Sequence, residues 1–177
     1  MESSRTLYGA ELHITTWGAS DVGRVRQVNE DCYIVAPDLG LLAVADGMGG
    51  HHRGDVASQL ACNVLKEAVS GHGAVIQMME RNPSESSRVA VEAMLENAVQ
   101  RASSEVFEAS GAIAGQGKRM GTTIDVLLVV AHTAFLAHVG DGRVYLLRDG
   151  EVHQLTRDHS VVEQQLSRGE LTPEEAR

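Results

Sequence analysis

Residues 41–51 read LLAVADGMGGH, and this stretch sets the expectations for both the fold and the site. The five residues before Asp46 are apolar and cannot all face water, so they predict a buried strand that ends at this carboxylate. A charge at that place needs a partner, and a metal cation is the simplest one. Gly47, Gly49 and Gly50 allow a tight turn that brings a backbone carbonyl close to such a cation.

Two other predicted strands carry acidic residues at one end. Glu30 and Asp31 lie at the start of the strand predicted at 32–36, and Asp141 follows the strand predicted at 133–139. Hard oxygen ligands without cysteine pairs suit magnesium or manganese better than zinc. Two such ions about 3.5–4 Å apart would polarise a phosphoryl group and activate a bridging water. The sequence therefore predicts a Mn²⁺ or Mg²⁺ site that acts on phosphate.

Five motifs carry a resemblance to a known family. In chain order they are Arg26 with Asn29-Glu30-Asp31, Asp46 to His51 with Gly54 and Ala57-Ser58, Gly121-Thr122-Thr123, His138 to Asp141, and Leu155-Thr156 with Asp158-His159-Ser160. Together they resemble the bacterial type of metal-dependent protein serine/threonine phosphatases, the PP2C or PPM family. The resemblance implies hydrolysis of phosphoserine and phosphothreonine by attack of a water that bridges two Mn²⁺ or Mg²⁺ ions.

The resemblance also implies a set of metal-binding residues. Asp46 would bridge the two central ions, and Gly47 would give its carbonyl to one of them. Asp31 would lie beside these ions, and Glu30 would hold water bound to them. Asp141 would hold a third, weaker ion.

Two further residues receive catalytic roles from the resemblance. Arg26 would bind the substrate phosphate, which a guanidinium can hold through two parallel hydrogen bonds. His51 would protonate the leaving serine or threonine oxygen. Both have a simpler alternative, because Arg26 could form only a structural ion pair with Glu30, and His51 with its neighbour His52 could merely be exposed.

The chain departs from the family pattern in two places. Gly142 follows Asp141 where the family usually has serine, which removes a hydroxyl near the third ion. The family's two later metal-binding aspartates have no counterpart, and residues 172–175 read as a helix start signal followed by only two residues. We therefore expect a C-terminally incomplete domain with weak metal binding and little or no turnover.

Two other functions remain open at this point. A non-catalytic regulatory or binding module with a phosphatase-like fold is favoured by the missing aspartates and disfavoured by the retained site residues. A zinc hydrolase built on His51, His52 and Asp46 is less favoured, because adjacent histidines point to opposite sides of an extended chain.

Periodicity predicts an α+β fold. Expected strands lie at 11–18, 32–36, 41–45, 123–130, 133–139, 143–148 and 151–154, and Asp149-Gly150 joins the last two as a hairpin turn. Expected helices lie at 55–70, 84–110 and 160–168. The first would bury Val56, Leu60, Val64 and Ala68, and the second Val91, Leu95, Ala98, Ala102 and Val106. The family resemblance implies a β-sandwich of two antiparallel sheets with helices on both outer faces.

Composition fits one domain over residues 1–177, with a loose N-terminal end at 1–6 and a variable flap at 167–177 beside the site. The net charge of -9 argues against a nucleic-acid partner. Two cysteines, without a secretory signal or a long apolar run, indicate a reducing, cytoplasmic setting with no membrane evident. A membrane-anchored parent, with a span in a later part of the protein, stays open as an alternative. We expect phosphorylated protein substrates and an opposing serine/threonine kinase. His138 and His159 are expected to be hydrogen-bonded core histidines rather than ligands.

Overall fold

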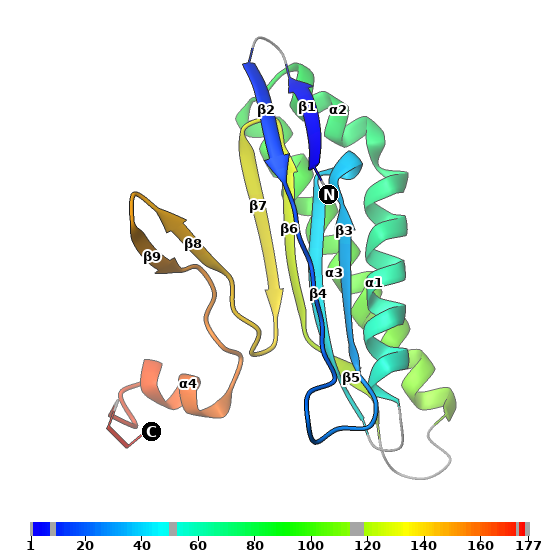
Figure 1. Ribbon diagram of the computed structural model, residues 1–177, viewed down its shortest axis with the longest axis vertical. Coiled ribbons are helices and arrows are strands. Elements are labelled where there is room, and N and C mark those ends of the chain that lie inside the picture. The colour runs from blue at the N-terminus through cyan, green and yellow to red at the C-terminus, as the bar shows by residue number, and fades with distance from the viewer. Residues whose placement is uncertain (1, 8–9, 50–52, 114–118, 173, 176–177) are drawn as a thin grey trace.

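The computed structural model describes residues 2–7, 10–49, 53–113, 119–172 and 174–175, and it shows the expected α+β fold (Figure 1). A five-stranded antiparallel sheet forms its centre. The order of the sheet is β3 (Asp31–Ala36), β4 (Leu41–Met48), β6 (Ile124–Val130) and β7 (Thr133–Val139), with β5 (Gly121–Thr122) paired to the end of β4. A 3-10 turn, η1 (Pro37–Leu39), connects β3 to β4.

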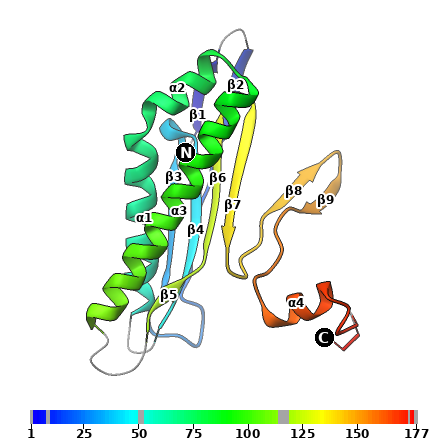
Figure 2. The ribbon, with the colours of Figure 1, turned by 180° about the vertical axis from the view of Figure 1, so that it is seen from behind.

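Three helices cover one face of this sheet, as the two opposite views show (Figures 1 and 2). They are α1 (Gly54–Gly71), α2 (Gly73–Arg81) and α3 (Glu85–Ile113). The sequence predicts α1 and α3 but not the short α2. Among the described residues, no helix is long and apolar enough to span a membrane.

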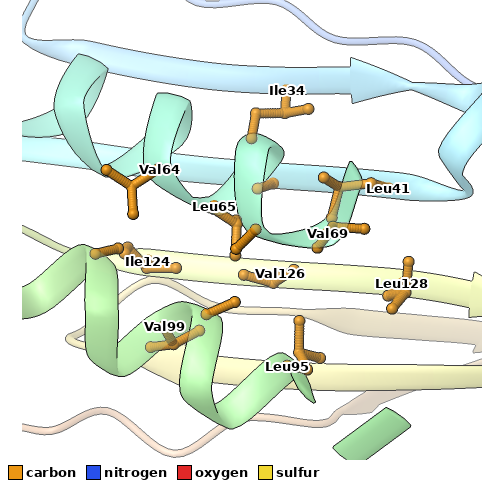
Figure 3. Close-up of a cluster of buried hydrophobic side chains, with 14 of the residues drawn as sticks. Ile34, Leu41, Val64, Leu65, Val69, Leu95, Val99, Ile124, Val126 and Leu128 are labelled. Carbon is orange, nitrogen blue, oxygen red and sulfur yellow. The ribbon is translucent and has the colours of Figure 1, made fainter. Parts of the chain in front are cut away.

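The core lies between the sheet and the helices (Figure 3). Alternate residues of β4 and β6 point into it, including Leu41, Val126 and Leu128, none of which is exposed. The stripe predicted for α3 is buried throughout. Of the stripe predicted for α1, Val64 and Ala68 are buried and Leu60 packs against the core, whereas Val56 is 45% exposed. Ala57, Ala61 and Leu65 are buried as well. Small alanines let α1 approach the sheet closely, which a search for large apolar residues does not anticipate.

Two hairpins lie outside the central sheet. The first joins β1 (Glu2–Leu7) to β2 (Ala10–Thr15), and the second joins β8 (Tyr145–Arg148) to β9 (Glu151–Gln154). Residues 2–6 of the segment expected to be a loose end belong to β1, which pairs with β2 through main-chain hydrogen bonds.

The face of the sheet away from the helices is only partly covered. It carries apolar side chains such as Tyr33, Val44 and Leu127, and a groove of about 390 Å³ lies over it. The two hairpins form separate small sheets, and the described helices cover one outer face rather than two. The antiparallel α+β architecture is confirmed.

Local signals in the C-terminal part are confirmed. Asp149 and Gly150 both have positive φ (54° and 83°), as the predicted two-residue turn requires. Helix α4 (Val161–Ser167) begins after Ser160, whose side chain accepts a hydrogen bond from the Glu163 amide. In both ribbon views, α4 and the β8–β9 hairpin project away from the central sheet (Figures 1 and 2).

Candidate metal centre

Two of the predicted metal ligands face each other at one edge of the central sheet. Asp31 begins β3 and Asp46 lies near the end of β4, and the antiparallel register makes them direct partners. Like charges directly opposite each other destabilise a sheet unless a cation neutralises them. The chain therefore places two carboxylates where a divalent ion would offset their repulsion.

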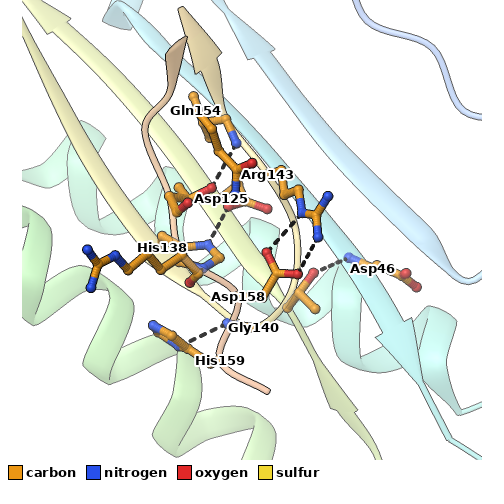
Figure 4. Close-up of polar contacts among 12 residues, drawn as sticks. Asp46, Asp125, His138, Gly140, Arg143, Gln154, Asp158 and His159 are labelled. Carbon is orange, nitrogen blue, oxygen red and sulfur yellow. Dashed lines mark hydrogen bonds and ion pairs between the residues drawn. The ribbon is translucent and has the colours of Figure 1, made fainter. Parts of the chain in front are cut away.

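The backbone of Asp46 is held on both sides by the adjoining threonines. Its amide donates to Oγ1 of Thr123 (3.0 Å), and its carbonyl accepts from the Thr123 amide (2.9 Å) and from Oγ1 of Thr122 (3.0 Å). Figure 4 shows the first of these bonds. The Gly121-Thr122-Thr123 motif thus fixes the strand end that carries the carboxylate, a role that the sequence alone does not reveal.

This arrangement leads to a stability prediction. Thr123→Val should lower the free energy of unfolding by about 1–2 kcal/mol, because the Asp46 amide loses the buried hydroxyl that accepts its hydrogen bond. Thr122→Val is the matched control and should cost less, since the carbonyl it serves keeps the Thr123 amide as a donor. Urea unfolding of both variants measures the difference. Equal losses would contradict the assigned role of the Thr123 hydroxyl.

Gly47 lies in a space that admits no side chain. Its amide donates to the backbone carbonyl of Glu30 (3.1 Å), and a Cβ at this position would overlap the carbonyl of Gly54. A Cβ at Gly54 would in turn lie 2.6 Å from Oε1 of Glu30 and 2.7 Å from the Gly47 carbonyl. Both glycines are thus needed for the β4 end to approach the start of α1 closely.

Glu30 contacts both the end of β4 and the start of α1. Its Oε1 accepts from the Gly54 amide (3.1 Å) at the start of α1, a favourable place for a carboxylate. Its Oε2 lies 3.2 Å from Arg26, and its backbone carbonyl accepts from Oγ of Ser58 (2.6 Å). The alternative of a structural Arg26–Glu30 pair is thus present in the structure, although the Arg26 side chain itself is 68% exposed.

Asp31 belongs to a second small network. Oγ of Ser20 donates to Oδ2 of Asp31 (2.8 Å), and the Asn29 side chain donates to Ser20 (2.7 Å) while accepting from the Asp31 amide (3.0 Å). Sequence reasoning quotes Asn29 within its motif but does not identify Ser20. These contacts orient the Asp31 carboxylate before any ion binds.

Several of the predicted site residues carry charges that affect the pKa of Asp46. Partial burial raises the pKa of this carboxyl, and the neighbouring carboxylates of Asp31 and Asp141 raise it further, while Arg26 acts in the opposite direction. Within the described part of the chain, no three acidic, cysteine or histidine side chains form a complete metal-ligand group. The oxygen donors nevertheless fit a hard divalent cation, because the strand register pairs the carboxylate-bearing residues Asp31 and Asp46 directly. His51 and His52 lie outside the described residues.

A polar network joins His138, Asp125, Gly140 and His159 (Figure 4). His138 is 2.7 Å from Oδ1 of Asp125 through Nδ1 and 2.9 Å from the Arg157 carbonyl through Nε2, so it is the hydrogen-bonded histidine that the sequence predicts. His159 accepts from the Gly140 amide (3.2 Å) but is exposed, so the expectation of a core position for it is wrong. The sequence does not reveal Asp125 as part of this network, because its contact, His138, lies on the neighbouring strand β7.

Comparisons with known proteins agree with this geometry. Residues 23–170 match the family described as protein phosphatase 2C. The serine/threonine protein phosphatase PstP of Mycobacterium tuberculosis is 39% identical over 157 residues, covering 89% of this chain and 27% of PstP. The protein phosphatase PhpP of Streptococcus pneumoniae is 34% identical over 160 residues, covering 89% of this chain and 60% of PhpP.

A solved structure extends the similarity to three dimensions. The catalytic domain of PstP in complex with two manganese ions gives a TM-score of 0.70 at 37% identity, covering 89% of this chain and 61% of that domain. The chain thus spans less than two thirds of the relatives that it matches. The family match covers most of its residues and includes the paired aspartates and the glycine turn, and the chain belongs to the protein phosphatase 2C family.

Proposed function

We propose that this chain supplies the core of a metal-dependent protein serine/threonine phosphatase that hydrolyses phosphoserine and phosphothreonine. The observation that carries this proposal is the pairing of Asp31 with Asp46 across β3 and β4, close to Asp141 and to the Arg26 guanidinium. Two Mn²⁺ or Mg²⁺ ions, when bound, supply charge neutralisation and a water of lowered pKa for attack on phosphorus.

Each site residue has a defined part in this proposal. Asp46, the Gly47 carbonyl and Asp31 would hold the central ions, with Glu30 beside them. Asp141 would hold the third ion. Asp46 and Glu30 are held in place, since hydrogen bonds fix the strand end at Asp46 and the backbone carbonyl of Glu30. Groups that are already in position need little reorganisation when the substrate reacts.

Arg26 would orient the substrate. Its side chain is 68% exposed and bonded to Glu30 at one nitrogen, which leaves donors of the guanidinium available to phosphate oxygens. Phosphoryl transfer depends mainly on positioning and charge neutralisation, so no nucleophilic side chain is required. His51 would protonate the leaving oxygen, as the resemblance implies.

The substrates follow from the same chemistry. We propose phosphorylated proteins, with a serine/threonine kinase as the opposing enzyme and the cytoplasm as the location. Both cysteines are free, which fits a reducing compartment. The net charge of -9 does not favour nucleic acid.

A regulatory module without turnover is the second candidate. The contact between Arg26 and Glu30 is compatible with it, because a purely structural ion pair would give the same geometry. In this version, the site would bind metal or phosphate weakly and would not release product.

The test is Mn²⁺-dependent phosphate release from a phosphothreonine peptide. The 177 residues are compared with the natural gene product read to its own stop codon. We expect release by the natural product that disappears with chelator, and little or none from the 177 residues alone. Metal binding without release by either protein would overturn the phosphatase proposal in favour of the regulatory module.

A further inference from the structure

Asp125 is an acidic residue on an otherwise apolar surface. It lies on the face of β6 that points away from the helices, between Val44 of β4 and His138 of β7 in the strand register. Its side chain is only 11% exposed, and it borders the groove over this face together with Gly142 and Arg143. A carboxylate in such surroundings lowers stability unless specific contacts compensate for its lost hydration.

One compensating contact joins Asp125 to the neighbouring strand. Its Oδ1 lies 2.7 Å from Nδ1 of His138, whose side chain is 10% exposed. The other ring nitrogen of His138 lies 2.9 Å from the Arg157 carbonyl. His138 therefore connects Asp125 to the segment that follows β9, and both side chains are held in place.

The second oxygen of Asp125 faces the Asp141 loop, defined here as residues 140–142. A Cβ placed on Gly142 would overlap Oδ2 of Asp125. The carboxylate therefore fills the space that a side chain at position 142 would need. Glycine at this position and aspartate at 125 form a matched pair, which explains in steric terms why serine is absent from position 142.

The other end of the Asp141 loop is also held. The Gly140 amide donates to Nδ1 of His159 (3.2 Å), and the His159 amide donates to the Gly140 carbonyl (2.6 Å). The rings of His138 and His159 are in contact, with centroids 4.7 Å apart. Gly140, which precedes Asp141, is thus held by His159, and Gly142, which follows it, lies against Asp125. Figure 4 shows the Gly140–His159 and Asp125–His138 contacts.

We propose that Asp125 is a positioning residue that sets the place of Asp141 through Gly142 and His138. It touches neither substrate nor the central ions in this proposal, and it acts through the Asp141 loop. The inference rests on the proposed function only in taking Asp141 as a metal ligand. A residue that supports a ligand in this way typically contributes 10–100-fold to metal affinity.

A double-mutant cycle in the natural gene product tests this coupling. Asp125→Ala and Gly142→Ser should each raise the Mn²⁺ concentration for half-saturation of the weakest site by about tenfold. Gly142→Ser should raise this Mn²⁺ concentration less when Asp125→Ala is also present, because the serine side chain then no longer overlaps the Asp125 carboxylate. Asp125→Asn should stay within about threefold of the parent, because its side-chain carbonyl still accepts from His138.

Two readouts besides activity complete the experiment. Mn²⁺ binding is followed by the loss of the free-ion electron paramagnetic resonance signal, and hydrogen exchange reports on the amides of the Asp141 loop. Leu127→Ala is the matched control, since Leu127 lies on the same face of β6 and borders the same groove. It should lower stability without changing Mn²⁺ affinity or exchange in the loop.

The outcomes separate this inference from the proposed function. Unchanged Mn²⁺ affinity and unchanged exchange in Asp125→Ala would overturn the positioning role, as would equal damage by Gly142→Ser with and without Asp125. A parent protein that binds no Mn²⁺ would instead contradict the proposed function. In that case, faster exchange of the Asp141 loop in Asp125→Ala would still support the coupling.

Discussion

Asp46→Asn is expected to abolish Mn²⁺-dependent phosphate release by the natural gene product, with a loss of at least about 100-fold, because the neutral amide weakens the hold on both central ions. The matched control is Asp38→Asn, which makes the same chemical change on η1, at the end of the β3–β4 pair opposite Asp31 and Asp46. It should retain the parent rate. Full Mn²⁺-dependent turnover in Asp46→Asn would contradict the metal assignment.

The same substitution should stabilise the metal-free protein. Burial and the charges of Asp31 and Asp141 raise the pKa of Asp46, so its ionisation is less favourable in the folded chain than in the unfolded one. The folded state therefore binds this proton more tightly, and stability decreases as pH rises from the ordinary carboxyl range through the raised pKa. At neutral pH with chelator, thermal unfolding of Asp46→Asn should occur at a higher temperature than that of the parent. A lower temperature would contradict this.

Gly47→Ala is expected to destabilise the chain by about 3 kcal/mol or more, because the added methyl group meets main-chain atoms that cannot rotate away. These atoms are the carbonyls of Gly54 and Glu30. The start of α1 would have to move from the end of β4, which also displaces the proposed metal-binding carbonyl. The free energy of unfolding, measured in urea, and the affinity for Mn²⁺ should both decrease.

Gly71→Ala is the control for that substitution. Gly71 is the last residue of α1, and a Cβ there would meet nothing within 4 Å. Alanine favours helix over glycine by up to about 1 kcal/mol, so this variant should be neutral or slightly more stable. Similar losses in Gly47→Ala and Gly71→Ala would show that the close approach of β4 and α1 is not the cause.

Features that depend on local periodicity could be predicted from the sequence. The buried stripe of α3 is confirmed, as are the strand that ends near Asp46 and the Asp149-Gly150 turn. In each case neighbouring residues supply the signal. The buried face of α1 is confirmed at Val64 and Ala68, but Val56 is exposed. Contacts with both the sheet and α3 bury Ala57 and Ala61 as well, and the apolar spacing alone does not predict this.

The candidate site shows the same division between local and distant signals. Carboxylates at strand ends predict the meeting of Asp31 and Asp46, because antiparallel strands bring a start and an end together. The capping contact of Glu30 with Gly54 and the hydroxyl of Thr123 depend on segments that are distant in the chain. Asp125 could be recognised only once the register placed it opposite His138.

The most direct test of the proposed metal centre is Mn²⁺ binding to the natural gene product and to its Asp46→Asn and Asp38→Asn variants, measured by electron paramagnetic resonance of the free ion. The account predicts tight binding by the parent and by Asp38→Asn, with affinity at least about tenfold weaker in Asp46→Asn. Equal affinity in all three proteins would contradict it, because the ions would then bind away from the paired aspartates.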